Sequence, residues 1–160
     1  MPRLTLGCTL PRGEAAVVCF ESQGHPTRCH LTVEGEYGET FRLSRPDTTA
    51  EMKASHNDEV KAVEHAAEGT AFLLIRRLTS YTVVQQMRRG TAADWWLAHR
   101  GQLLQHAARL ECSGTLTGGA SELASRTKKK IDRARRAKPT LPTYVCITSF
   151  KYARAKVELL

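Results

Sequence analysis

The chain has 160 residues, of which 41% are hydrophobic and 25% are charged, a composition typical of one globular domain or of a small domain joined to a modest one. No apolar run approaches the roughly 20 residues of a membrane span, and the first residues lack the apolar core of a signal peptide, so we expect a cytoplasmic protein with no membrane partner. The formal net charge of +8 indicates a polyanionic partner, such as nucleic acid.

The first 45 residues have the pattern of short strands separated by turns that contain glycine or proline. We predict a small antiparallel β element over residues 1–45, which offers a surface for a protein partner or for a second copy of the chain. Residues 46–56 are rich in turn formers and are predicted to be a linker. The expected strands cover residues 4–10, 15–20, 29–33 and 40–43.

A helix is predicted to begin at Asn57 or Asp58, because apolar residues then recur at steps of three and four. At about 100° per residue, Glu64 points into this apolar stripe and Glu68 lies at its edge. A carboxylate on an apolar face needs a partner. The simpler interpretation of Glu64 is a rim residue paired with an arginine or with a backbone amide.

Three strands are predicted next, over residues 81–87, 94–98 and 107–113. A second helix begins near Ala120 or Ser121 and ends before Pro139, a strand covers residues 143–150, and a short basic tail follows. The predicted core domain, residues 57–160, therefore has the order helix, three strands, helix, strand. The fold class is α+β.

The second helix is strongly basic. Residues 121–138 hold eight lysines and arginines against two acids. A solvated helix face is often charged, but rarely with so few acids, so this helix is predicted to contact the phosphates of a nucleic acid. The residues assigned to that contact are Arg126, Lys128, Lys129, Arg133 and Arg136.

Two acids stand on neighbouring predicted strands. Asp94 and Glu111 are separated by a turn, so antiparallel pairing could place them side by side. Two carboxylates are enough to hold Mg²⁺ (or Mn²⁺), because water and substrate phosphate complete its coordination, and the carbonyl of Cys112 offers a third oxygen. A metal held there would activate water to hydrolyse a phosphodiester.

These elements resemble the core of the PD-(D/E)XK, or restriction-endonuclease-like, nucleases. The segments GTAADWWL (residues 90–97) and RLECSG (residues 109–114) look like those of small uncharacterised bacterial proteins in this group. The resemblance covers about residues 57–150 and implies an α-β-β-β-α-β core. It also implies that Glu64, Asp94 and Glu111 bind the metal.

The chain departs from the family pattern at one position. The resemblance implies a lysine two residues after the third acid, where this chain has Ser113. Some members of the superfamily supply that lysine from the following helix. On the helical wheel Lys130 and Arg126 lean toward the sheet, so Lys130 is the expected substitute and Arg126 is expected to flank it.

Two functions follow from this pattern, and a third remains open. The first is metal-dependent hydrolysis of nucleic acid, DNA in preference to RNA, by an endonuclease with a role in defence or repair. The second is a non-catalytic nucleic-acid-binding or scaffolding subunit of a larger bacterial complex, which the serine at position 113 favours. The third is an unrelated α+β protein whose basic helix meets RNA or an acidic partner.

The aromatic residues near the two acids have a simpler interpretation. Trp95 and Trp96 must point to opposite faces of their strand, so one is expected in the core and the other partly exposed. Core packing is favoured over stacking on a base. His106 could approach the acids if its turn is tight. The five cysteines form no CxxC pair and are expected to be reduced.

Overall fold

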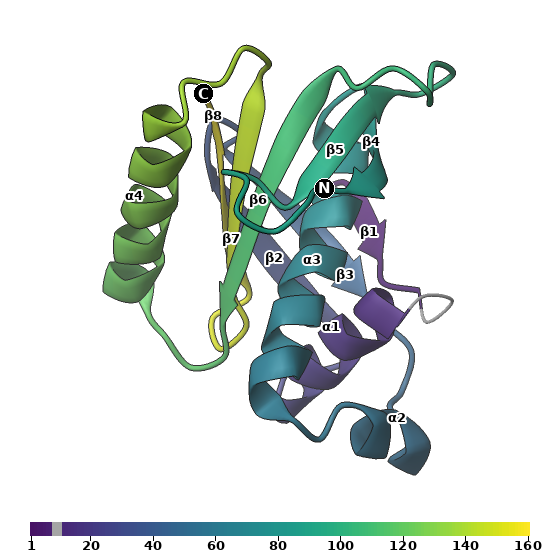
Figure 1. Cartoon of the computed structure of the whole chain (residues 1–160). Helices are drawn as coiled ribbons and strands as arrows, with labels where there is room; N and C mark the ends of the chain where they lie inside the picture. The colour runs from purple at the N-terminus through teal and green to yellow at the C-terminus, as the bar shows by residue number, and fades with distance from the viewer. Residues whose placement is uncertain (8–10) are drawn as a thin grey trace.

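The computed structural model describes residues 1–7 and 11–160, and in these residues it has four helices and one eight-stranded sheet (Figure 1). This mixed architecture is compatible with the predicted α+β class. The helices are α1 (Pro11–Ser22), α2 (Ala50–Ser55), α3 (Glu59–Leu78) and α4 (Ala120–Arg136). The strands are β1 (Arg3–Thr5), β2 (Arg28–Gly35), β3 (Glu39–Ser44), β4 (Tyr81–Gln86), β5 (Trp95–His99), β6 (Ala108–Thr115), β7 (Thr143–Ser149) and β8 (Arg154–Leu159).

The sheet has the strand order β1-β3-β2-β8-β7-β6-β5-β4. Strands β4, β5 and β6 form an antiparallel meander, and β6 pairs with β7 in parallel. A parallel pair requires a crossover connection, and α4 supplies it between β6 and β7. From residue 57 onward the chain runs through one helix, three strands, a second helix and then two strands, β7 and β8.

The two faces of the sheet are covered differently. Helices α1 and α3 pack against each other, and α3 contacts β4, β6 and β7 on one face. Helix α4 lies on the opposite face, against β6 and β7, and in Figure 1 it stands well away from β4 and β5. Beneath α4, Leu123 packs on Val145 and Ile147 in a cluster separate from the main core.

Residues 15–20, predicted to be a strand, lie in helix α1. All six are buried, and α1 packs against α3. The two helices approach closely at Gly69, where a Cβ atom would lie only 2.4 Å from the carbonyl oxygen of Arg12. A short apolar run has no periodicity that separates a buried helix from a buried strand, which is why the prediction was wrong.

The N-terminal strands belong to the same sheet as the rest of the chain. Strand β2 pairs with β3 in antiparallel orientation, as predicted, but it also pairs in parallel with β8. Strand β8 occupies the segment that was predicted to be a basic tail. The first predicted strand is observed only at Arg3–Thr5, and residues 8–10 of it lie outside the described residues.

The predicted linker, residues 46–56, contains the short helix α2. Thr49 caps it by accepting a hydrogen bond from the backbone N–H of Met52 at 3.2 Å. Across residues 1–7 and 11–160, the structure has no helix with the length and apolar character needed to cross a membrane.

Candidate functional site

Helix α3 begins after Asp58, whose side chain caps it, and this register decides where its two central acids lie. Glu64 is exposed, so the prediction that it points into the apolar stripe was wrong. The buried acid is Glu68, one turn later. Its carboxylate accepts hydrogen bonds from the Trp95 indole at 3.0 Å and from Arg12, so both of its oxygens have partners in the core.

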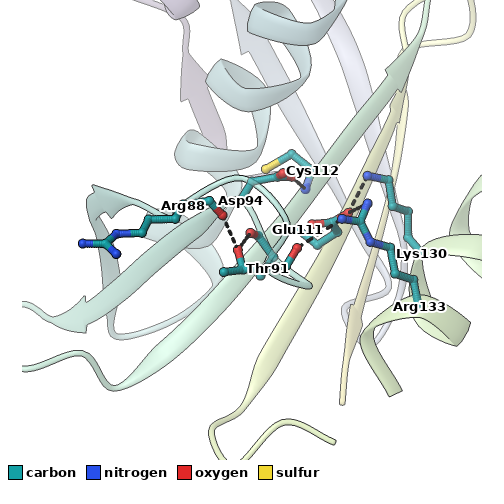
Figure 2. Close-up of polar contacts among 8 residues, drawn as sticks. Arg88, Thr91, Asp94, Glu111, Cys112, Lys130 and Arg133 are labelled. Carbon is teal, nitrogen blue, oxygen red and sulfur yellow. Dashed lines mark hydrogen bonds and ion pairs between the residues drawn. The ribbon is translucent and has the colours of Figure 1, made fainter. Parts of the chain in front are cut away.

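Glu111 is the most deeply buried acid at the site, with only 1% of the residue exposed. It lies in β6 between β5 and β7 and points toward α4. Its Oε1 accepts a hydrogen bond from Lys130, and a second cation, Arg133, lies 3.8 Å away (Figure 2). Among the described residues its Oε2 has no hydrogen-bond partner. A buried carboxylate oxygen without a partner is free to accept a ligand.

Asp94 stands directly before β5, where the pairing of β5 with β6 ends. Trp95 pairs with Leu110, so the same register brings Asp94 level with Glu111. Asp94 is held on β6 by two hydrogen bonds. Its backbone N–H donates to the Leu110 carbonyl at 2.9 Å, and its carboxylate accepts from the Cys112 N–H at 2.8 Å. The Asp94 carboxylate thus accepts a hydrogen bond from β6 in place of a backbone carbonyl, and the side chain is fixed beside that strand.

The hairpin that carries Asp94 is also tied to α4. Thr91 Oγ1 donates to the carbonyls of Arg88 at 2.8 Å and Ala93 at 2.9 Å, and Arg133 donates to the Thr91 carbonyl at 3.1 Å. Arg133 therefore bridges the turn before Asp94 and the carboxylate of Glu111. Sequence reasoning assigned Arg133 to phosphate contact alone and missed this role, because the hairpin's position over α4 is a tertiary feature.

Burial raises the pKa of Glu111, and the nearby carboxylate of Asp94 raises it further, while Lys130 and Arg133 oppose both effects. The upward direction means that the two cations do not fully offset the loss of hydration. An additional positive charge beside Glu111 would favour its ionised form.

Two neighbouring cavities at this site have linings of opposite charge. A cavity of about 510 Å³ between α3 and β6 is lined by five acids and only two cations. A second cavity, of about 460 Å³, lies along α4 and is lined by four cations and one acid. The two cavities share Ser113, Glu122, Arg126 and Lys130. The five acids of the first are Glu59, Glu64, Glu68, Asp94 and Glu122.

The structure thus brings together three of the four predicted catalytic residues. Lys130 reaches Glu111 from the following helix, as expected from the helical wheel, and Asp94 lies beside them. Glu64 lines the same acidic cavity as Asp94 and Lys130 without a direct contact. In residues 1–7 and 11–160, no group of three or more histidine, cysteine, aspartate or glutamate side chains is arranged to hold a metal ion.

The basic face of α4 is open to solvent. Lys128, Lys129, Arg133 and Arg136 are exposed. Arg126 instead turns toward the acidic cavity and pairs with Glu122 at 2.9 Å, one helical turn away. Four of the five residues predicted to contact phosphates are therefore available on one helix surface.

Among the described residues, His106 forms a hydrogen bond with Gln85 and none with Asp94 or Glu111. Its ring stacks on Trp96 with a centroid separation of 4.5 Å and an interplanar angle of 5°. Trp95 is buried against α3 and Trp96 is partly exposed, as the alternation of the strand predicted.

The cysteines that the structure describes carry free thiols, as expected. Burial, with a contribution from Glu59, raises the pKa of Cys19 to about 12. Burial also raises the pKa of Cys146 to about 12. Thiols this weakly acidic stay protonated near neutral pH and do not act as nucleophiles.

Comparison with known proteins adds no relative. A scan against family models, a search of curated proteins and a search of solved structures each found no match. The resemblance to PD-(D/E)XK nucleases remains a prediction from the two segments of sequence at residues 90–97 and 109–114.

Proposed function

We propose that this protein hydrolyses phosphodiester bonds of DNA at a metal site formed by Asp94 and Glu111, in a core of the restriction-endonuclease-like kind. The observation that carries the proposal is the Glu111–Lys130 pair beside Asp94, because Asp94 lines the acidic cavity and Lys130 lines both the acidic and the basic one. A metal ion belongs in the acidic cavity, and a phosphate group belongs in the basic one.

The residues fit a magnesium ion with few protein ligands. Glu111 offers a buried oxygen without a partner, and Asp94 beside it supplies the second carboxylate. Magnesium often takes only one or two carboxylates and completes its shell with water and substrate phosphate, so the lack of a three-residue cluster among the described residues is compatible with it. Glu64, across the cavity, would reach the metal through water.

Magnesium or manganese bound there would polarise the phosphodiester and lower the pKa of the attacking water. The chain's own residues would do the rest. Lys130 would exchange its hydrogen bond to Glu111 for one to the attacking water or to the developing charge on phosphate. The exposed cations of α4 would hold the flanking phosphates, and Arg133 would keep the turn before Asp94 in place.

The direct test is cleavage of plasmid and single-stranded DNA with Mg²⁺ or Mn²⁺. We expect Asp94→Asn, Glu111→Gln and Lys130→Met each to lower the cleavage rate about 100-fold or more. Glu34→Gln, which removes a partly exposed acid from β2, is the matched control and should cut like the wild type. Cleavage that survives all three site substitutions would refute the proposed site.

The ion pair between Glu111 and Lys130 is also compatible with a second, non-catalytic function. Glu111 is buried and already paired with Lys130 and Arg133, and Asp94 already accepts a backbone hydrogen bond. These contacts would suffice for a non-catalytic subunit that binds nucleic acid through α4. No cutting under any metal condition, together with salt-sensitive DNA binding that depends on the α4 cations, would establish that function instead.

A further inference from the structure

We propose that the Trp96–His106 stack is a base-binding platform for single-stranded DNA, placed next to the Glu111 site. This inference rests on the proposed function for the choice of DNA and deepens it by naming an unpaired strand as the substrate. The stack lies on the part of the sheet that α4 leaves open.

The face of each residue follows from the pleat of the strands. Trp95 packs against Phe72 of α3, so Trp96, its neighbour in β5, points to the opposite face, which carries α4. Glu111 contacts α4, and Arg109, two residues earlier in β6, shares its face. Trp96 pairs directly with Arg109. An aromatic ring and a cation therefore stand side by side on the α4 side of the sheet.

The ring of His106 is held as a flat plate over Trp96. The two rings are nearly parallel, and Nε2 of His106 forms a hydrogen bond with Gln85 Oε1 at 3.1 Å. The histidine is exposed and Trp96 is partly exposed. A ring held in place on one side and open to water on the other can accept a base without first being ordered.

The position of the platform suits a strand that runs through the proposed site. Arg109 precedes Glu111 by two residues, which corresponds to roughly 7 Å along a strand. That length is close to the spacing of successive nucleotides in an extended strand. Arg109, Arg133 and Lys129 supply positive charge along the same path. The bases of a duplex are already stacked on each other, so only an unpaired base can use the plate.

The test is binding of a fluorescent oligodeoxynucleotide of about 16 nucleotides, and of its duplex, without added metal. We expect His106→Ala to weaken single-strand binding about 5-fold or more, because one stacked base loses its platform, and to leave duplex binding unchanged. His106→Phe should restore single-strand binding. His99→Ala is the matched control, because His99 is also an exposed histidine next to an aromatic ring, Tyr81, but on the α3 side of the sheet.

Three outcomes would refute the proposed base-binding platform. His106→Ala could bind the single strand as tightly as the wild type, it could bind single strand and duplex with an equal loss of affinity, or His106→Phe could fail to restore binding. Tighter binding of the same sequence as RNA would overturn the assignment to DNA. Because no metal is present, the result is independent of cleavage. A protein that binds through the stack but never cuts would refute only the proposed hydrolysis, and a protein that cuts without needing His106 would refute only this inference.

Discussion

The two faces of the sheet carry the same types of residue, but these residues are fully paired on one face and only partly paired on the other. On the α3 side, tryptophan, glutamate and arginine form a closed group, because Trp95 and Arg12 together satisfy Glu68. On the α4 side, the corresponding residues are Trp96, Glu111 and Arg133, and they are left partly open. The closed group stabilises the fold, while the open one carries an unpartnered carboxylate oxygen and exposed rings and cations among the residues that the structure describes. The types of residue present are therefore a poor guide to function. Whether each polar side chain has all of its hydrogen-bond partners is a better guide.

The largest expected difference between the two faces is in stability. Trp95→Ala should lower the free energy of unfolding by about 3–5 kcal/mol, because it leaves a large cavity and removes a hydrogen bond from Glu68. Trp96→Ala, made in the neighbouring residue, should lower it by less than half as much. Urea denaturation of both variants measures the difference. Equal destabilisation would mean that the α4 side is packed as tightly as the core.

A smaller effect is expected at the contact between α1 and α3. Gly69→Ala would place a Cβ atom against the backbone of Arg12, so we expect the free energy of unfolding to fall by about 1–3 kcal/mol. Gly38→Ala is the control, because no atom lies within 4 Å of its added Cβ. Thermal or urea unfolding compares the two, and an unchanged Gly69→Ala would show that the two helices separate easily.

The positive charges of α4, on the face of the sheet that is only partly paired, should affect DNA binding and leave the free energy of unfolding unchanged. Replacing Lys128, Lys129 and Arg136 by glutamine should reduce the slope of log K against log salt by roughly 0.9 for each phosphate that is no longer neutralised, with stability unchanged to within about 0.5 kcal/mol. Removing Lys61, Arg76 and Arg77 from α3 subtracts the same charge from the other side of the sheet. A DNA titration at several salt concentrations that cannot tell the two triple variants apart would refute α4 as the binding surface.

The smallest expected effect is a dependence of the free energy of unfolding on pH, caused by the titration of Glu111. Its pKa is raised by burial, so the folded protein binds that proton more tightly than the unfolded chain does. The resulting stabilisation is complete below the unfolded value of about 4.3 and is lost as the pH rises through the folded pKa. Glu111→Gln does not titrate, so it should gain stability relative to the wild type as the pH rises from the unfolded value through the folded pKa of Glu111.

Glu122 supplies the control of opposite sign for this pH dependence. Its hydrogen bonds with Arg126 and Thr115 lower its pKa, so its stabilisation is present above the unfolded pKa and is lost on acidification. Glu122→Gln should therefore lose stability relative to the wild type as the pH rises. Unfolding curves at several pH values that show the same sign for both variants would contradict this account.

The sequence predicted the elements from residue 57 onward because their periodicities are long and their ends are marked. Asp58 caps α3 as the pattern indicated, and Lys130 lies on the face of α4 that the helical wheel assigned to the sheet. The wheel failed for Glu64, because the buried side of α3 is defined by α1 as well as by the sheet. Strand β8 was missed because its short apolar alternation is interrupted by charged residues, and because one of its two partners, β2, comes from a distant part of the chain. The stacking of His106 on Trp96 likewise depends on a loop conformation that periodicity does not encode.

The binding of a divalent metal by Asp94 and Glu111 together, which we propose, can be measured without any substrate. Calorimetric titration with Mn²⁺ should show one site in the wild type and in Glu34→Gln, and no saturable binding in Asp94→Asn or Glu111→Gln. Absence of binding to the wild type, or undiminished binding to both site variants, would contradict the claim and leave a nucleic-acid-binding protein whose buried ion pair serves the fold.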